Sequence, residues 1–284
     1  MSLLFYFVPF LIRFNYNTVM KLHILQLSFA HVTSKEFKSI RNGEVLKEST
    51  VKKLVKAKTI SLSYIKETLS KHGVTFITQQ SEFYPQLLKQ IYDPPYVLYV
   101  KGDLKVLQTN FLGVVGSRKA SAYTTHVLKK LLPSLKSLSI VSGLAYGADD
   151  IAHYISLENG LNTVGVLAFG HDIHYPTSTF KTRQRMEEVC CTISEYPPGT
   201  QINKYRFVER NRIIAGMSHG VLVTEAEEKS GSLITLEMAM DENRYVFCVP
   251  GNITSPLSIG VNERLKEGAI LVTNSDDILI ELNI

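Results

Sequence analysis

The sequence of 284 residues contains no tryptophan and only three cysteines, two of which, Cys190 and Cys191, are adjacent. This spacing makes neither a disulfide framework nor the paired CxxC pattern of a zinc ribbon or finger. So few cysteines fit the reducing cytosol, and we expect a cytoplasmic protein. No apolar run approaches the ~20 residues that span a bilayer, so we expect no membrane association.

Familiar nucleotide and metal motifs are missing as well. The chain contains neither GxGxxG nor a Walker A sequence, which argues against a standard dinucleotide or P-loop nucleotide site. His171 and His174 have a spacing that metal ligands use, but no carboxylate or thiolate partner follows at a suitable distance in the sequence. We therefore expect neither a metal nor another cofactor.

Charge is distributed unevenly along the chain. The whole sequence has 31 Lys and Arg against 26 Asp and Glu, a formal net charge of +5. Residues 1–105 carry 15 basic against 7 acidic side chains, or +8, whereas residues 106–284 carry 16 against 19, or −3. An excess of +5 permits an anionic partner without requiring one, but the split predicts two parts of different character.

The N-terminal part predicts an extension followed by a small helical domain. Residues 1–19 begin with an apolar run that has no positive charge before it and no small-residue cleavage site after it, which favours a disordered or loosely packed extension over a signal peptide. Residues 20–80 predict short helices, with Thr33 as an N-cap. The crowded lysines of this domain form either a solvated face or a weak phosphate-contacting patch: Lys52, Lys53, Lys56 and Lys58.

Residues 81–284 alternate short apolar runs with helical patterns. Continuous Val, Ile and Leu runs are typical of a parallel sheet covered on both faces, and helical patterns at 148–158, 209–217 and 233–242 fall between them. The fold class predicted is α/β, an extended Rossmann-like doubly wound, mostly parallel sheet with its ligand at the carboxyl ends of the strands. The runs are 112–115, 139–141, 163–168, 191–194, 220–224, 245–249 and 269–272.

Three turns at the ends of these runs carry the candidate chemistry. Gly116-Ser117-Arg118 places a small residue, a hydroxyl and a guanidinium where we expect the next helix to begin, which predicts an anion site. Lys229 and Ser230 open a second phosphate-compatible turn. The turn at 142–149 ends in acidic residues that would repel phosphate, so we expect it to shape the pocket.

A basic segment at 204–212 has four cations and one acid within nine residues, interleaved with Tyr205 and Phe207. Cations for phosphates and an aromatic ring for base stacking are the composition of a groove that binds single-stranded nucleic acid. The alternative is a solvated basic start of a helix. The sequence leaves both open.

A series of short motifs runs along the second part of the chain: Asp93-Pro94-Pro95, Gly116-Ser117-Arg118, the segments 142–149, 210–216 and 230–235, Val249-Pro250-Gly251 and Gly260-Val261-Asn262. Taken together and in this order, these motifs resemble the DNA-processing protein A (DprA/Smf) family. The resemblance runs from about Tyr84 to the C-terminus and is specific because the motifs occur in combination.

This resemblance implies a protein that binds single-stranded DNA and loads the RecA recombinase onto it during natural transformation. It also implies a cytoplasmic homodimer without catalytic activity, whose Rossmann-like domain follows a helical SAM-like domain. No winged-helix domain is expected after residue 284, and Val208-Glu209 stands where the family commonly has a proline. The predicted DNA-binding set is Gly116, Ser117, Arg118, Lys204, Phe207, Arg210, Asn211, Arg212, Lys229 and Ser230.

Two other classes of function stay open. The segment 230–237 is loosely similar to the Gly-Gly-x-Gly-Thr-x-x-Glu turn of nucleotide-cleaving phosphoribohydrolases, which would make Glu237 an acid/base and Arg118 a phosphate clamp. A nucleotide sensor on the same fold would use the same turn without cleavage. A pure protein-interaction scaffold would bind no DNA at all.

Overall fold

The computed structural model describes residues 22–284, so the expected extension at 1–19 lies outside the described residues. The chain divides into two compact units between Ile65 and Lys66. Within residues 22–284, no helix combines the length and the apolar character that crossing a membrane requires.

The first unit is helical, with α2 (Ile24–Phe29), α3 (Ser34–Arg41) and α4 (Glu48–Thr59). Thr33 caps α3 by accepting from the backbone N–H of Glu36, and the Glu36 carboxylate accepts from the Thr33 N–H in return. Glu36 also pairs with Lys53 at 2.6 Å, and Glu48 pairs with Lys52 at 2.7 Å, so two cations of the crowded lysine cluster already have acidic partners. A small apolar core joins these helices: Leu27, Ala30, Val32, Ile40, Leu54 and Ala57.

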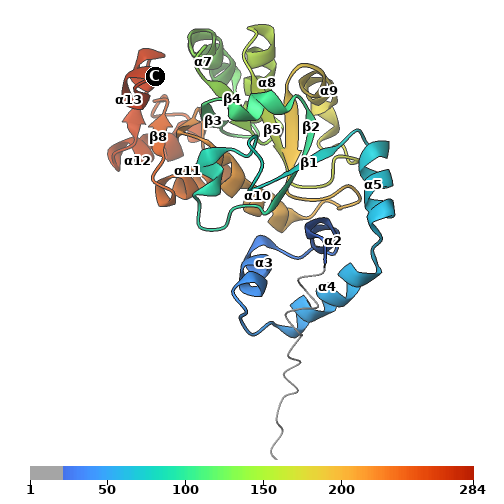
Figure 1. The fold of residues 1–284 in the computed structure, drawn as a ribbon. Helices are drawn as coiled ribbons and strands as arrows, with labels where there is room; N and C mark the ends of the chain where they lie inside the picture. Colours follow the sequence, from blue (N-terminus) through green and yellow to red (C-terminus); the bar gives the residue numbers. More distant parts are fainter. Residues whose placement is uncertain (1–21) are drawn as a thin grey trace, which may run out of the picture. The chain divides into compact units, whose positions relative to one another are not determined.

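The second unit is built on a nine-stranded sheet in the order β1-β2-β6-β5-β4-β3-β7-β8-β9 (Figure 1). Strands β3 to β9 pair in parallel, while β1 and β2 add an antiparallel edge through β2–β1 and β2–β6. The expected doubly wound, mostly parallel sheet is therefore confirmed. The strands are β1 (Thr75–Thr78), β2 (Val97–Gly102), β3 (Phe111–Val115), β4 (Ser139–Ser142), β5 (Thr163–Leu167), β6 (Cys191–Ser194), β7 (Gly220–Val223), β8 (Tyr245–Cys248) and β9 (Ile270–Leu271).

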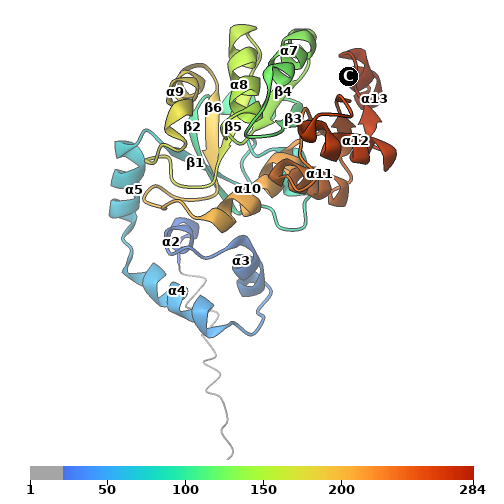
Figure 2. The ribbon, with the colours of Figure 1, turned by 180° about the vertical axis from the view of Figure 1, so that it is seen from behind.

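Helices cover both faces of the sheet (Figures 1 and 2). One face packs its apolar side chains against α7 (Ala122–Leu131) and α8 (Ala148–Glu158), the other against α10 (Lys204–Met217) and α11 (Gly231–Asp241). Burial on both faces explains why the strands are continuous Val, Ile and Leu runs. The remaining helices of this unit include α5 (Leu62–Lys71), which begins in the first unit, α6 (Gln86–Lys89), α9 (Phe180–Val189), α12 (Ile259–Lys266) and α13 (Asp276–Leu282), with 3-10 turns η1 (Leu104–Gln108), η2 (Leu132–Ser134), η3 (Thr177–Thr179) and η4 (Pro256–Ser258).

The strand order reverses direction beside β3. From β3 the chain proceeds through β4, β5 and β6 toward one side, and it then returns to add β7, β8 and β9 on the other. The loops that follow β3 and β7 therefore diverge and leave room between them, which is where doubly wound folds place their ligands.

Some local expectations need correction. Helix α10 begins at Lys204 rather than at 209, because Asn203 accepts from the Tyr205 N–H and caps it there. Helix α9 has no counterpart in the predicted set, since its sequence is mostly polar and carries a weak apolar stripe. By contrast, the alternating pattern at 74–78 predicts a short strand, and the structure confirms it as β1, which pairs with β2 in the sheet although it falls within the stretch 20–80.

Candidate functional site

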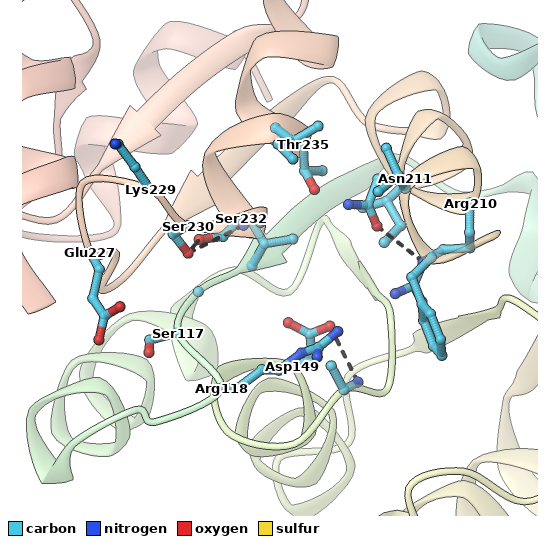
Figure 3. Close-up of a pocket in the computed structure, with 18 of the residues that line it drawn as sticks. Ser117, Arg118, Asp149, Arg210, Asn211, Glu227, Lys229, Ser230, Ser232 and Thr235 are labelled. Atoms are coloured by element: carbon cyan, nitrogen blue, oxygen red, sulfur yellow. Dashed lines mark hydrogen bonds between the residues drawn. The ribbon is translucent and has the colours of Figure 1, made fainter. Parts of the chain in front are cut away.

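A cavity of about 360 Å³ opens at the reversal point of the sheet (Figure 3). Four segments line it: the loop after β3, the turn before α8, one face of α10 and the turn that opens α11. Of the predicted DNA-binding set, all residues except Lys204 and Arg212 line the cavity. Its volume lies within the range of pockets that bind small organic groups such as a nucleotide.

The loop after β3 carries the exposed cations of the site. Arg118 and Lys119 are both exposed, and among the described residues neither forms a salt bridge. Lys119 is absent from the predicted set, although its position beside Arg118 was a usable signal. Gly116 allows this loop to pack closely against Thr224, because a Cβ at position 116 would lie only 2.6 Å from Oγ1 of Thr224.

The expected anion site at a helix start is not what this loop forms. Helix α7 begins only at Ala122, with Ser121 as its N-cap, so Ser117 and Arg118 lie in the connecting loop. The N–H of Ser117 donates to the carbonyl of Glu225 at 2.8 Å. Positive charge on this side of the cavity therefore comes from the side chains of Arg118 and Lys119. The Ser117 N–H is not available to an anion, because it already donates to the Glu225 carbonyl.

Glu225 is a buried carboxylate that ties the loops after β7 and β3 together. It accepts from the N–H of Ser121 at 2.8 Å, from Oγ of Ser121 at 2.7 Å and from Oγ1 of Thr124 at 2.7 Å. Three donors satisfy this acid, so its charge is directed away from a ligand in the cavity. Nothing in the sequence except its place at a strand end marked Glu225 for this role.

One face of α10 supplies the aromatic ring and an amide. Lys204, Phe207 and Asn211 are spaced three and four residues apart, which places them along the same side of the helix. The guanidinium carbon of Arg118 lies 5.9 Å from the centroid of the Phe207 ring, a cation–π distance. Lys204 is exposed in the first turn, one turn away from the residues that line the cavity.

Arg210 lines the cavity, but its guanidinium is buried within the protein. Only 4% of the residue is exposed; it donates to the carbonyl of Gly143 at 2.6 Å and to the carbonyl of Val166. Asp149 lies nearby and accepts from the N–H groups of Gly143 at 3.1 Å and Ala145 at 3.3 Å. Burial lowers the pKa of Arg210 to about 10, opposed by the Asp149 charge, and burial raises the pKa of Asp149.

Arg212 points to a different part of the molecule. Its Nη2 atom donates to both carboxylate oxygens of Glu195, at 2.7 and 2.9 Å, and Nε lies 3.6 Å from Oδ2 of Asp93. Although burial opposes it, these two acids raise the pKa of Arg212. The expectation that Arg210 and Arg212 contact DNA is therefore corrected: Arg210 holds the turn at 143–149, and Arg212 anchors the Pro94-Pro95 lead-in to β2.

The turn that opens α11 contributes hydroxyl groups and a lysine. Ser230 caps the helix by accepting from the Ser232 N–H, and Lys229 and Glu227 are exposed at the rim of the cavity. Glu237, the acid that the phosphoribohydrolase alternative requires, is exposed and pairs with Arg264 at 2.7 Å. It does not line the cavity with Arg118, so the structure does not assemble that pair of residues.

No metal centre is found within residues 22–284, where no three His, Cys, Asp or Glu side chains cluster as a metal ion would require. His171 is buried, with Nε2 3.2 Å from the carbonyl of Thr192. Burial lowers its pKa to about 4, with Arg183 acting in the same direction, so it is a neutral core residue near pH 7.

Fold and site together define a Rossmann-like protein whose cavity, at the reversal point, combines exposed cations with an aromatic ring. The chain belongs to the DNA recombination-mediator protein A family, whose model matches residues 75–283. It is 44% identical over 199 residues to the DNA processing protein DprA of Streptococcus pneumoniae, covering 70% of this chain and 71% of that protein. The resemblance stated from the motifs is confirmed.

Solved structures agree. The X-ray structure of DNA processing protein A from Streptococcus pneumoniae superposes with a TM-score of 0.82 at 35% identity, covering 91% of this chain and 96% of that one. DNA processing protein A from Helicobacter pylori, described in its single-stranded DNA binding mode, gives a TM-score of 0.66 at 29% identity, covering 74% and 96%. The membership establishes a role in DNA processing and recombination mediation.

Proposed function

We propose that the cavity at the reversal point binds single-stranded DNA and that the protein loads the RecA recombinase onto the bound strand during natural transformation. The observation that carries the proposal is the meeting of Arg118, Lys119 and Phe207 at one cavity, with Lys229 at its rim and Asn211 on its wall. Exposed cations that form no salt bridge within residues 22–284 can bind phosphates, and a half-buried ring offers a face to a base.

The arrangement favours single strands over duplex. A base reaches Phe207 only if it is unstacked from its neighbours, because the ring lies inside a cavity. Stacking uses the π-face that every base has, so the expected binding tolerates different sequences. The relative from Helicobacter pylori, described with single-stranded DNA, supports the same choice of ligand. We further propose a non-catalytic, cytoplasmic homodimer.

The proposed DNA contacts come from the predicted set after the corrections above, with Lys119 added because it lines the same cavity. Arg118, Lys119, Lys204 and Lys229 would bind phosphates, Phe207 would stack on a base, and Asn211, Ser117 and Ser230 would donate or accept hydrogen bonds at the wall. Gly116 would permit the close approach of the backbone. Arg210 and Arg212 would act by holding the loops in place.

Fluorescence anisotropy with labelled oligo-dT, measured over a series of salt concentrations, tests DNA binding. Arg118→Ala and Lys119→Ala should each weaken binding by about tenfold and reduce the slope of log K against log salt by about 1. Lys129→Ala, which removes an exposed lysine of α7 outside the cavity, is the matched control and should bind like wild type. Unchanged affinity and slope in both cavity variants would rule out this site.

Recombinase loading is tested separately. RecA is added last to oligo-dT that is already coated with a single-strand binding protein, and the rate of ATP hydrolysis by RecA is used to monitor filament formation. The wild-type chain should shorten the lag, and Arg118→Ala should not. Normal DNA binding without any effect on the lag would refute loading while leaving the DNA site intact.

A further inference from the structure

A second, narrower crevice of about 60 Å³ adjoins the cavity. Arg118, Ala145 and Phe207 line both the cavity and the crevice. Because these residues line both spaces, a DNA strand that contacts Phe207 in the cavity would lie next to the crevice. The remaining residues that line the crevice are Gly143, Leu144, Tyr146, Ala168, Phe169, Tyr175 and Pro176.

Three aromatic rings form a packed unit at the crevice. The centroid of Phe169 lies 6.4 Å from that of Phe207 and 6.5 Å from that of Tyr175, and Tyr175 lies 5.9 Å from Phe207. These separations are those of favourable edge-to-face and tilted pairs. Phe169 is buried, whereas Tyr175 is 47% exposed, so the unit has a fixed base and an open upper surface.

The crevice is apolar except at the side that it shares with the cavity. Among the residues that the structure describes, Arg118 is the only charged one that lines the crevice, and none of the lining residues is acidic. Tyr146, 60% exposed, is a further aromatic residue of the lining. A space of this size does not enclose a nucleobase, so an aromatic ligand would lie across the opening, with its face on the exposed tyrosine.

We propose that Tyr175, held by Phe169 and Phe207, stacks on a second nucleobase of the strand, and that Arg118 binds the phosphate between this base and the one on Phe207. The inference rests on the proposed function. Its occupant is a base of the same single strand because the aromatic unit continues from Phe207 and because Arg118 lies at the junction of the two spaces.

The variants Tyr175→Leu and Tyr175→Phe test the stack in the full chain. Tyr175→Leu keeps an apolar side chain but removes the ring, and it should weaken binding of labelled oligo-dT by roughly tenfold without changing the salt slope, since the ring contacts no phosphate. Tyr175→Phe retains the ring and should bind within about twofold of wild type. Tyr154→Leu, at an exposed tyrosine of α8 outside both spaces, is the matched control.

A second measurement needs no variant. Oligo-dT with single 5-iododeoxyuridine substitutions is irradiated on the wild-type protein, and cross-linked residues are identified by mass spectrometry. Cross-links to Tyr175 and to Phe207 from neighbouring positions in the strand are expected. Wild-type affinity for Tyr175→Leu, or no cross-link to Tyr175 while Phe207 is labelled, would overturn the second subsite. Failure of Arg118→Ala to weaken binding would instead overturn the DNA site itself.

Discussion

Arg210 provides the sharpest test of how the cavity is built. Its guanidinium is buried, donates to the carbonyls of Gly143 and Val166, and lies beside the buried Asp149. Arg210→Ala would leave two buried carbonyls without these donors and would remove the cation that compensates Asp149. Leaving a buried carboxylate without its neighbouring cation, together with two buried carbonyls without these donors, costs about 3–5 kcal/mol of unfolding free energy. In a domain of this size the loss lowers Tm by roughly 10 °C.

The matched control is Arg185→Ala. Arg185 forms an ion pair with Glu158 in which both side chains are 47% exposed. Exposed pairs contribute about 0–1 kcal/mol, so this variant should unfold close to wild type. Urea unfolding followed by circular dichroism at pH 7 gives both free energies on one scale.

A double variant separates the cost of the uncompensated Asp149 charge from the cost of the lost hydrogen bonds to Gly143 and Val166. Asp149→Asn removes the buried charge that Arg210→Ala leaves uncompensated, so Arg210→Ala/Asp149→Asn should be more stable than Arg210→Ala alone. If Arg210→Ala costs no more than Arg185→Ala, the guanidinium does not hold the turn at 143–149 and the reasoning is refuted.

Two further predictions concern the backbone and pH. Gly147 has φ +86°, and a Cβ there would lie 2.5 Å from the Ser117 carbonyl oxygen. Gly147→Ala should therefore displace the loop that carries Arg118 and weaken oligo-dT binding. The control is Gly160→Ala, also at positive φ but with open space around its Cβ, which should only lower the free energy of unfolding by about 1–2 kcal/mol. Burial lowers the pKa of His153 to about 3 and of His171 to about 4. As pH falls below about 6.5 the unfolded chain therefore takes up protons that the folded chain excludes, and urea unfolding at pH 5 should show about 2 kcal/mol less stability per histidine than at pH 7. His171→Gln should remove about 2 kcal/mol of this dependence, and a flat wild-type profile between these pH values would contradict the prediction.

Much of the fold followed from local pattern. Strands buried on both faces must be continuous apolar runs, so the sequence located them to within a residue or two, as in β6 at Cys191–Ser194. The turns at their carboxyl ends had to hold the ligand-facing groups, because parallel strands end on one edge of the sheet. Helix α9 is not predicted from the sequence, because a polar helix with a narrow buried stripe has only a weak periodic pattern of apolar residues.

The sequence by itself determined which segments would meet at the candidate site: the turn after β3, the basic start of α10 and the turn before α11. Only the tertiary structure decided which of their charges remain free. Arg118, Arg210 and Arg212 look alike in a sequence, yet Arg118 is exposed, Arg210 donates to Gly143, and Arg212 pairs with Glu195. The reason is physical: these partners lie on other elements, far along the chain, so whether a cation faces solvent or a protein acceptor is settled when the elements pack.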